Sequence, residues 1–425
     1  MRALRVAGTI RVPGDKSISH RALMLGALAD GRSTIRGILQ SDDVASTARV
    51  LRALGAEIPA LSDDMSFLGT GRAGLRSPNQ TLDCGNSGTT ARLIAGIVAG
   101  ACVDATLIGD ASLSTRPMAR VARPLQQMGA DVSFPATPDR LPMHIAGRAL
   151  HGVHYASPTA SAQIKSAVLL AAVTARITAS VEEPQRSRDH SERMLRAMGV
   201  EMTIGDVEVA ITHVPERLKP LEIDVAGDPS SAAYFLALGS LAQAGQLRLT
   251  NVLLNPTRIG FMDALRRMGA RLHVLDERLQ AGEPVGDVVV DSGHALVATE
   301  VNAPEVPSMI DELPLLACVA SQAQGETVIR GAREMRVKES DRIAVTVANL
   351  SAIGVQSSEL PDGLRVTGRQ APLRGPVATH DDHRIAMSFG ILGALPGNEV
   401  VVDNPGCVTI SYPDFWRDLE RARAE

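Results

Sequence analysis

The stretch Pro13–Gly31, PGDKSISHRALMLGALADG, sets a glycine turn and a group of polar and cationic residues directly before an apolar run. That run is apolar on every side of a helix, which is typical of a buried helix. We expect a serine N-cap at its start, where the unpaired N–H groups of the first turn carry a partial positive charge. The stretch therefore predicts a buried helix, and its start fits either an anion site or an ordinary capped first turn.

The same pattern occurs six times along the 425 residues. In each copy, small polar residues, often with a cation, precede a helix that is apolar nearly all round. The copies are Ser17–Gly31, Gly85–Gly100, Ser161–Arg176, Pro229–Gly245, Pro307–Gly325 and Asp381–Gly397. Internal repetition of this kind indicates a fold built from equivalent supersecondary units.

A second pattern follows each buried helix: a β-like run, a polar loop and an amphipathic helix that ends at a glycine. It reads VLRALGAEI, PLQQMGADV, MLRAMGVEM, ALRRMGARL and NLSAIGVQS, and the sixth copy is SYPDFWRDLERARAE. We expect the glycines to be left-handed C-caps, at Gly55, Gly129, Gly199, Gly269 and Gly354. The chain is therefore predicted to be an α/β protein of six repeated α/β units, three in each of two similar domains.

The composition excludes several classes of protein. Hydrophobic residues make up 45% and charged residues 21%, as in a globular protein, and aromatic residues only 2%. We therefore expect an aliphatic core and no nucleic-acid binding, because single strands are held by aromatic stacking. A net charge of −4 gives no general attraction to phosphate backbones, so any anion site must be a local group of cations.

Cysteine and histidine spacing favours neither disulfides nor a metal. Cys84, Cys102, Cys318 and Cys407 are scattered, and we predict buried free thiols in a reducing, cytoplasmic compartment. The segment HDDH at His380–His383 offers metal ligands without a second cluster to support them, so we predict no metal and no cofactor. No signal peptide or membrane-spanning run is evident, and we expect no membrane contact.

Chemistry-bearing residues gather at the polar starts of the six units. Each has an ordinary interpretation in isolation, as an N-cap, a surface charge or part of a solvated charge run; they include Gly88, Arg116, Ser161, Gln163, Arg188, Asp311, Lys338, Glu339, Arg342 and Arg384. Donors at six separate helix starts are unexpected as surface decoration. We therefore predict a small, multiply anionic ligand, bound by arginine forks and lysine point charges.

These motifs resemble those of the 5-enolpyruvylshikimate-3-phosphate synthase family, in its class II spelling. The resemblance runs from PGDKSISHRAL through GNSGTTAR, GDASLSTRPM, SAQIKSA, IDELP, RVKESDR and DDHRIAM to SYPDF. It implies the enolpyruvyl transferase fold, a two-domain inside-out α/β barrel with six folding units. The implied domains are 15–226 and 1–14 plus 227–425, with crossovers near Gly14 and Gly227 and the active site in the cleft between them.

The resemblance also implies the reaction, which is transfer of the enolpyruvyl group of phosphoenolpyruvate to the 5-hydroxyl of shikimate 3-phosphate, with release of phosphate. Members of the family are targets of glyphosate. The residues implied to hold shikimate 3-phosphate are Lys16, Ser17, Arg21, Ser161, Gln163, Arg188, Asp311 and Lys338. Those implied to hold phosphoenolpyruvate are Lys16, Gly88, Arg116, Gln163, Arg342 and Arg384, and the implied catalytic residues are Lys16, Asp311 and Glu339.

Two positions depart from the class I pattern: Ile410 stands where class I carries a lysine, and Glu334 where it carries an asparagine. The alternatives are a UDP-N-acetylglucosamine enolpyruvyl transferase, a kinase with a degenerate phosphate loop, and a non-catalytic anion-binding paralogue. The first typically has a cysteine in the loop Gly109–Pro117, which lacks one here. The second needs a glycine directly before Lys16. We expect a monomer.

Overall fold

The computed structural model describes residues 3–368 and 372–424. The chain divides into two compact units. Unit 1 comprises the chain up to Pro13, Ala226–Leu279 and the chain from Pro284 onward. Unit 2 comprises Gly14–Val225 together with Gln280–Glu283.

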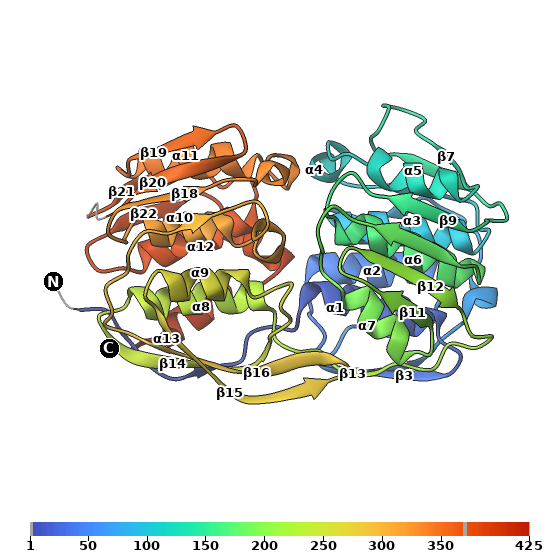
Figure 1. Ribbon diagram of the computed structural model, residues 1–425, viewed down its shortest axis with the longest axis horizontal. Helices are drawn as coiled ribbons and strands as arrows, with labels where there is room; N and C mark the ends of the chain where they lie inside the picture. The colour runs from blue at the N-terminus through green and yellow to red at the C-terminus, as the bar shows by residue number, and fades with distance from the viewer. Residues whose placement is uncertain (1–2, 369–371, 425) are drawn as a thin grey trace. The chain divides into compact units, whose positions relative to one another are not determined.

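All six predicted buried helices are confirmed, three in each unit. They are α1 (Lys16–Leu28), α3 (Gly88–Gly100) and α6 (Ala162–Ala175) in unit 2, and α8 (Pro229–Leu241), α10 (Leu313–Ala320) and α12 (His383–Gly393) in unit 1. Within unit 1, α8, α10 and α12 contact one another, and within unit 2, α3 contacts both α1 and α6 (Figure 1). These helices supply the centre of each core.

The predicted amphipathic helices lie outside the buried ones. They are α2 (Asp42–Ala53), α5 (Ala119–Gln127), α7 (His190–Ala197), α9 (Gly260–Arg267), α11 (Arg342–Ala352) and α13 (Phe415–Ala422). The remaining helical turns are α4 (Ala111–Ser114), η1 (Arg72–Gly74), η2 (Val306–Ser308), η3 (Arg333–Val337) and η4 (Pro405–Ile410).

Each unit contains three sheets in the described part of the chain. In unit 2 they are β3 (Arg32–Arg36) with β4 (Asp64–Leu68) and β13 (Glu222–Asp224); β5 (Leu82–Asp83) with β6 (Ala105–Ile108), β7 (Asp131–Ser133) and β8 (Met143–Ala146); and β9 (Val153–Ala156) with β10 (Ala179–Glu182), β11 (Glu201–Ile204) and β12 (Glu208–His213). In unit 1 they are β1 (Arg5–Val6) with β2 (Thr9–Ile10), β14 (Ala244–Leu253), β15 (Arg271–Gln280), β16 (Glu283–Asp291) and β23 (Arg423–Ala424); β17 (Glu300–Val301) with β18 (Glu326–Ile329), β19 (Ser357–Leu360) and β20 (Gly363–Thr367); and β21 (Arg374–Val377) with β22 (Glu399–Val402).

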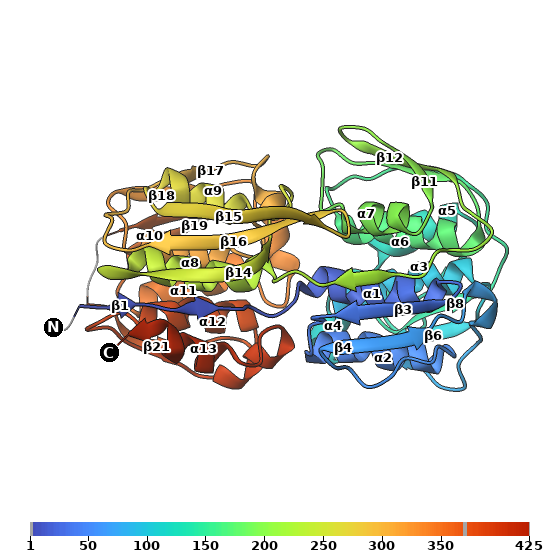
Figure 2. The same cartoon turned by 90° about the horizontal axis from the view of Figure 1, so that it is seen from below.

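The repetition seen in the sequence reappears as repeated strand order. In all three four-stranded sheets the first strand in the chain pairs parallel with the second, the second antiparallel with the fourth, and the fourth antiparallel with the third. The buried helix connects the two parallel strands. Figure 2 shows β15, β16, β14 and β1 of the largest sheet in their bonded order.

The five predicted C-cap glycines are confirmed by their backbone angles. Gly55, Gly129, Gly199, Gly269 and Gly354 have φ between 91° and 102°. L-residues with a Cβ rarely adopt this conformation, whereas glycine adopts it readily. Each glycine therefore ends an amphipathic helix and turns the chain toward the next strand.

Two further glycines allow α3 and α6 to pack closely. A Cβ on Gly96 would come 2.2 Å from the carbonyl oxygen of Ala167, and one on Gly100 would come 2.5 Å from that of Ala171. Both distances are far below van der Waals contact. Because glycine has no side chain, the backbones of α3 and α6 can approach closely at these two positions.

Three expectations need correction. Asp15, rather than a serine, is the N-cap of α1, and its Oδ1 accepts from the Ile18 N–H at 2.8 Å. Cys102 is exposed in the turn after α3, whereas the other three cysteines are buried as predicted. The core is mainly aliphatic, but unit 1 also packs an aromatic group, which consists of Tyr234, Phe235, Tyr412, Phe415 and Trp416.

A buried chain of hydroxyl groups joins α1, α2 and α3. His20 Nδ1 lies 2.7 Å from Thr47 Oγ1, which lies 2.6 Å from Thr90 Oγ1, which in turn lies 2.8 Å from Ser87 Oγ. Burial, with the nearby charges of Lys16 and Arg21, lowers the pKa of His20 well below its ordinary value of 6.5. His20 is therefore neutral in the folded protein.

We predict that Gly354→Ala lowers the free energy of unfolding by about 1 kcal/mol, and that Gly354→Asn lowers it less. A Cβ at this position meets no atom within 4 Å, so backbone strain at φ 91° is the only penalty, and asparagine tolerates positive φ better than alanine. Urea denaturation of both variants measures the difference. Equal losses would contradict the assigned backbone conformation.

We predict that acid destabilises the protein through His20. Below pH 6.5 His20 is protonated in the unfolded chain but stays neutral in the folded protein, because its pKa is lowered there. The free energy of unfolding therefore decreases as the pH falls below 6.5. The gap in stability between the wild type and His20→Asn should narrow by up to about 1.4 kcal/mol per pH unit below that value.

Thermal unfolding at a series of pH values measures this gap. The matched control is His213→Asn, because His213 is an exposed histidine of the same unit. A constant gap for His20→Asn would refute the assignment of a neutral, buried imidazole.

Candidate functional site

The predicted site residues at the start of α1 lie together. Lys16 is the first residue of the helix, and its Nζ lies 3.1 Å from Asp43 Oδ2. One turn later, Arg21 is only 3% exposed and donates to the hydroxyls of Ser166 and Ser191 at 2.7 Å each. It also donates to the Ser17 carbonyl at 2.9 Å. These bonds fix the orientation of a buried cation beside a partly exposed one.

A second group surrounds the start of α3, where Ser87 is the N-cap and Gly88 the first helical residue. A Cβ on Gly88 would lie 2.6 Å from Arg92 Nη1 and 3.5 Å from Arg116 Nη1. The missing side chain therefore leaves room for two guanidinium groups beside the helix N-terminus. Such a place favours an anion, because the helix end and both side chains are positive.

Neighbouring polar side chains orient both arginines. Arg116 is 6% exposed and donates to Asn86 Oδ1 at 2.6 Å and to Ser112 Oγ at 3.1 Å. Arg92 Nη1 donates to Gln163 Oε1 at 2.9 Å. This last bond connects the start of α3 to the start of α6, so the structure brings the predicted residues Gly88, Arg116 and Gln163 together.

Ser161 and Arg188 belong to the third group in unit 2. Ser161 is the N-cap of α6, as expected, and its side chain accepts from the Ile164 N–H. Arg188 is half-buried on the loop before α7. Glu183 and Ser187 connect these two places through hydrogen bonds between 2.9 and 3.4 Å.

In unit 1 the predicted residues surround one guanidinium group. Arg342 is 1% exposed; its Nη1 lies 3.1 Å from Asp311 Oδ1 and its Nη2 lies 2.7 Å from Glu339 Oε2. Its Nε donates to Asp382 Oδ2 at 2.8 Å. Lys338 Nζ lies 3.1 Å from the same Asp311 oxygen. Two predicted acid–base carboxylates are thus held by one buried cation.

Electrostatics keep the two buried arginines of unit 1 charged. Burial lowers the pKa of Arg342, but the charges of Asp382, Glu339 and Asp311 outweigh it, and the pKa lies well above its ordinary value. The pKa of Arg384 is also raised despite burial. In contrast, the side chains of Asp311 and Glu339 remain 15% and 19% exposed, so a substrate can reach them.

The predicted residues fall into two sets by unit. Unit 2 holds Lys16, Ser17, Arg21, Gly88, Arg116, Ser161, Gln163 and Arg188, and unit 1 holds Asp311, Lys338, Glu339, Arg342 and Arg384. Most members of the unit 2 set stand at the N-terminal ends of buried helices, whereas Lys338, Glu339 and Arg342 of the unit 1 set stand at the start of the amphipathic helix α11. The predicted site residues are therefore concentrated at helix starts.

The partners that orient the predicted site residues and the buried Lys165 were not predicted from the sequence. Asp382, the N-cap of α12, accepts from both Arg342 and the Arg384 N–H. Lys165 lies between Glu183 and Glu192, at 2.8 Å from each. The available signal was a lysine inside a helix that is otherwise apolar, because a buried charge needs a partner.

One group of metal-binding residue types occurs among the described residues, and it does not include the HDDH segment at His380–His383. Its members are Asp189, His190 and Glu283 in unit 2. His190 Nδ1 lies 2.8 Å from Glu283 Oε1, and Arg193 Nε lies 3.0 Å from Asp189 Oδ1 and 3.5 Å from Glu283 Oε2. These contacts identify an ion-pair network, and we assign it no metal.

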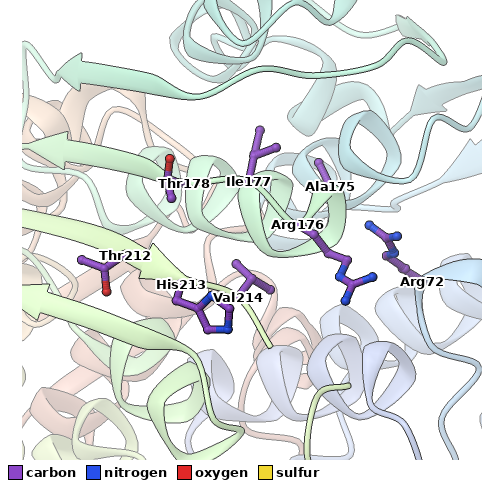
Figure 3. Close-up of a pocket in the computed structure, with 8 residues that line it drawn as sticks. All are labelled: Arg72, Ala175, Arg176, Ile177, Thr178, Thr212, His213 and Val214. Atoms are coloured by element: carbon purple, nitrogen blue, oxygen red, sulfur yellow. The ribbon is translucent and has the colours of Figure 1, made fainter. Parts of the chain in front are cut away.

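A pocket of about 490 Å³ opens at the C-terminal end of α6 (Figure 3). It is lined by Arg72, Ala175, Arg176, Ile177, Thr178, Thr212, His213 and Val214. None of these is a predicted site residue, and Ser161 and Gln163 lie at the opposite end of the same helix. Arg72 donates to the Thr174 carbonyl, which complements the negative end of the helix dipole. The pocket is thus separate from the candidate site.

The helices in the described part of the chain are all too short or too polar to cross a bilayer.

Comparison with known proteins places the chain in a family. The family model of EPSP synthase (3-phosphoshikimate 1-carboxyvinyltransferase) matches residues 2–419. A 3-phosphoshikimate 1-carboxyvinyltransferase of Gloeobacter violaceus is 47% identical and is aligned over 100% of this chain and 98% of its own. The one from Sulfurihydrogenibium sp. is 45% identical over 98% of this chain and 97% of its own.

Solved structures agree. An EPSP synthase of Acinetobacter baumannii has a TM-score of 0.88 at 37% identity and covers 99% of this chain and 97% of its own. The enolpyruvyl transferase NikO of Streptomyces tendae has a TM-score of 0.76 at 20% identity, with 99% and 98% coverage, which supports the fold alone. The two-domain enolpyruvyl transferase fold is thereby confirmed, and the UDP-N-acetylglucosamine alternative is not favoured. The chain is a carboxyvinyl transferase of the shikimate pathway and belongs to the EPSP synthase (3-phosphoshikimate 1-carboxyvinyltransferase) family.

Proposed function

We propose that the residue sets of the two units form one active site for shikimate 3-phosphate and phosphoenolpyruvate. Domain 15–226 and the domain formed by 1–14 and 227–425 would each contribute one set. The observation that carries this proposal is the arrangement around Arg342, where one buried cation holds the partly exposed carboxylates of Asp311 and Glu339. A pair of held carboxylates suits a reaction that removes one proton and delivers another.

Charge explains why so many cations are needed. Both substrates are anions and repel each other, so they can react only where fixed cations replace their water. In unit 2 we assign the phosphoenolpyruvate anion to Lys16, Gly88, Arg116 and Gln163, and in unit 1 to Arg342 and Arg384. The closeness of Arg116 to Gly88 supports this assignment, because a ligand there meets a guanidinium group and a helix N-terminus together.

We assign shikimate 3-phosphate to the helix starts of α1 and α6, the loop before α7 and the Asp311–Lys338 pair. The residues are Lys16, Ser17, Arg21, Ser161, Gln163, Arg188, Asp311 and Lys338. Arg188 stands on a loop whose neighbours Ser187 and Asp189 are buried and hydrogen-bonded. A loop held in this way loses little freedom when Arg188 binds the phosphate group.

The proposed reaction is an addition followed by an elimination. Asp311 accepts the proton of the 5-hydroxyl while the hydroxyl oxygen forms a bond to C2 of phosphoenolpyruvate. Glu339, together with Lys16, delivers a proton to C3. The tetrahedral adduct then loses a proton from C3 as the C2–phosphate bond breaks. That proton returns to Glu339 and Lys16, and the electrons of the C3–H bond form the C2=C3 double bond. The phosphate leaves with the electrons of the C2–oxygen bond and takes up the proton that Asp311 accepted.

We also propose a cytoplasmic location and a monomeric state for the protein. Four free cysteines, three of them buried, support a reducing cytoplasm. We propose a monomer that binds neither nucleic acid nor membrane, and sedimentation analysis tests the oligomeric state.

We predict that Asp311→Asn lowers kcat by roughly 10²- to 10⁴-fold, because the amide cannot accept the hydroxyl proton. A phosphate-release assay with both substrates measures the loss. Asp206→Asn, which removes an exposed carboxylate, is the control and should keep full activity. Near-normal turnover of the first variant with unchanged KM values would reject the role of Asp311.

We predict that Arg188→Ala raises the KM for shikimate 3-phosphate about tenfold or more, with a smaller effect on the KM for phosphoenolpyruvate. The reason is the loss of a charged donor to the substrate phosphate group. Arg217→Ala removes an exposed arginine of the same unit and serves as the control. An unchanged KM would show that Arg188 does not bind the substrate.

A further inference from the structure

Lys165 is a buried charge in the apolar helix α6. It is 1% exposed, and its Nζ lies 2.8 Å from Glu183 Oε2 and 2.8 Å from Glu192 Oε1, while both glutamates are nearly as buried as the lysine. Burial lowers the pKa of Lys165, but the charges of Glu192 and Glu183 outweigh it, and the pKa is raised overall. The lysine is therefore charged, and it lies between two buried carboxyl groups.

Glu183 has a second set of partners. Its Oε1 accepts from the Ser161 N–H at 2.9 Å. Its Oε2 accepts from the Ser187 hydroxyl at 2.9 Å and, more weakly, from the Ser187 N–H at 3.4 Å. One carboxylate thus joins the N-cap of α6 to the residue directly before Arg188, and Lys165 holds that carboxylate in place.

The far side of the Arg188 loop is fixed independently. Asp189 accepts from Arg193 Nε and from Arg186 Nη2, both at 3.0 Å. The residue after it, His190, lies fully buried against Glu283. The backbone on both sides of Arg188 is therefore held by buried or half-buried polar contacts.

Glu192 provides an internal contrast. It is 1% exposed and lies as close to Lys165 as Glu183 does. However, none of its hydrogen bonds or ion pairs within the described residues reaches Ser161 or Ser187. The two glutamates are therefore both buried against Lys165, but only Glu183 is connected to Ser161 and Ser187.

We propose that Lys165 and Glu183 are positioning residues for shikimate 3-phosphate, which keep Ser161 and Arg188 at the spacing that its phosphate group requires. This inference rests on the proposed substrate contacts of Ser161 and Arg188. Holding both donors before the substrate arrives avoids the entropy that ordering them would cost on binding. Because neither residue touches the substrate, their loss weakens binding without removing an acid or base.

The test compares Glu183→Gln with the matched variant Glu192→Gln. A glutamine at 183 presents an N–H₂ group to Lys165 and Ser187, or to the Ser161 N–H, so one set of donors loses its acceptor. Glu183→Gln should raise the KM for shikimate 3-phosphate about tenfold and leave kcat and the KM for phosphoenolpyruvate within about twofold. Glu192→Gln should leave all three constants within about twofold of the wild type.

Circular dichroism and thermal unfolding confirm that the variants are folded. If Glu183→Gln fails to fold, Ser187→Ala replaces it, because that variant removes only the hydroxyl bond to Glu183; it should raise the same KM about threefold. Equal KM values for the two glutamine variants, or an unchanged KM in the folded Glu183 variant or its Ser187 substitute, would overturn the proposal.

Arg188→Ala separates this failure from failure of the proposed substrate contacts. If Arg188→Ala raises the KM and Glu183→Gln does not, the substrate contact stands and only the positioning role is wrong. If Arg188→Ala leaves the KM unchanged, both are wrong.

Discussion

A charged side chain buried beside apolar helices is stable only when opposite charges and hydrogen bonds surround it, and both units are arranged around this constraint. Arg342 in unit 1 meets three carboxylates. Lys165 in unit 2 meets two. Arg258 illustrates the same rule away from the predicted residues, since it is 2% exposed and donates to Asp228 at 2.8 Å. Apart from Glu339, which lies three residues before Arg342, these partners lie on other segments of the chain.

The same constraint also explains how an enzyme of the EPSP synthase family holds its charged site residues in place before the reaction. Helices that are apolar on every side carry few charged groups along their length, so most of the ionic contacts gather near helix starts. A network that is already formed needs no rearrangement when charge develops during a reaction. The partly exposed faces of Asp311 and Glu339 are what such a network leaves available to a substrate. The same buried ionic contacts therefore stabilise the core and position the site residues.

Much of the fold could be predicted because its signals are local. Whether a helix is apolar all round depends on residues within a few turns, and the positive φ of Gly55 and Gly354 depends on the residue itself. The local signal failed at the first helix, where Asp15 rather than a serine forms the cap. It failed again at Cys102, which we expected to be a buried free thiol but which is exposed in the turn after α3.

The sequence by itself determined the six repeated units, their helix ends and the residue types that gather there, because each follows from periodicity and from short motifs. Only the tertiary structure decided which distant groups meet. Lys165 and Glu192 are separated in the chain by β10, and Asp311 and Arg342 by α10, β18 and η3. The reason is physical: the partner of a buried charge is chosen by how helices and strands pack, and the close approach of α3 and α6 at Gly96 is one such choice that no single segment contains.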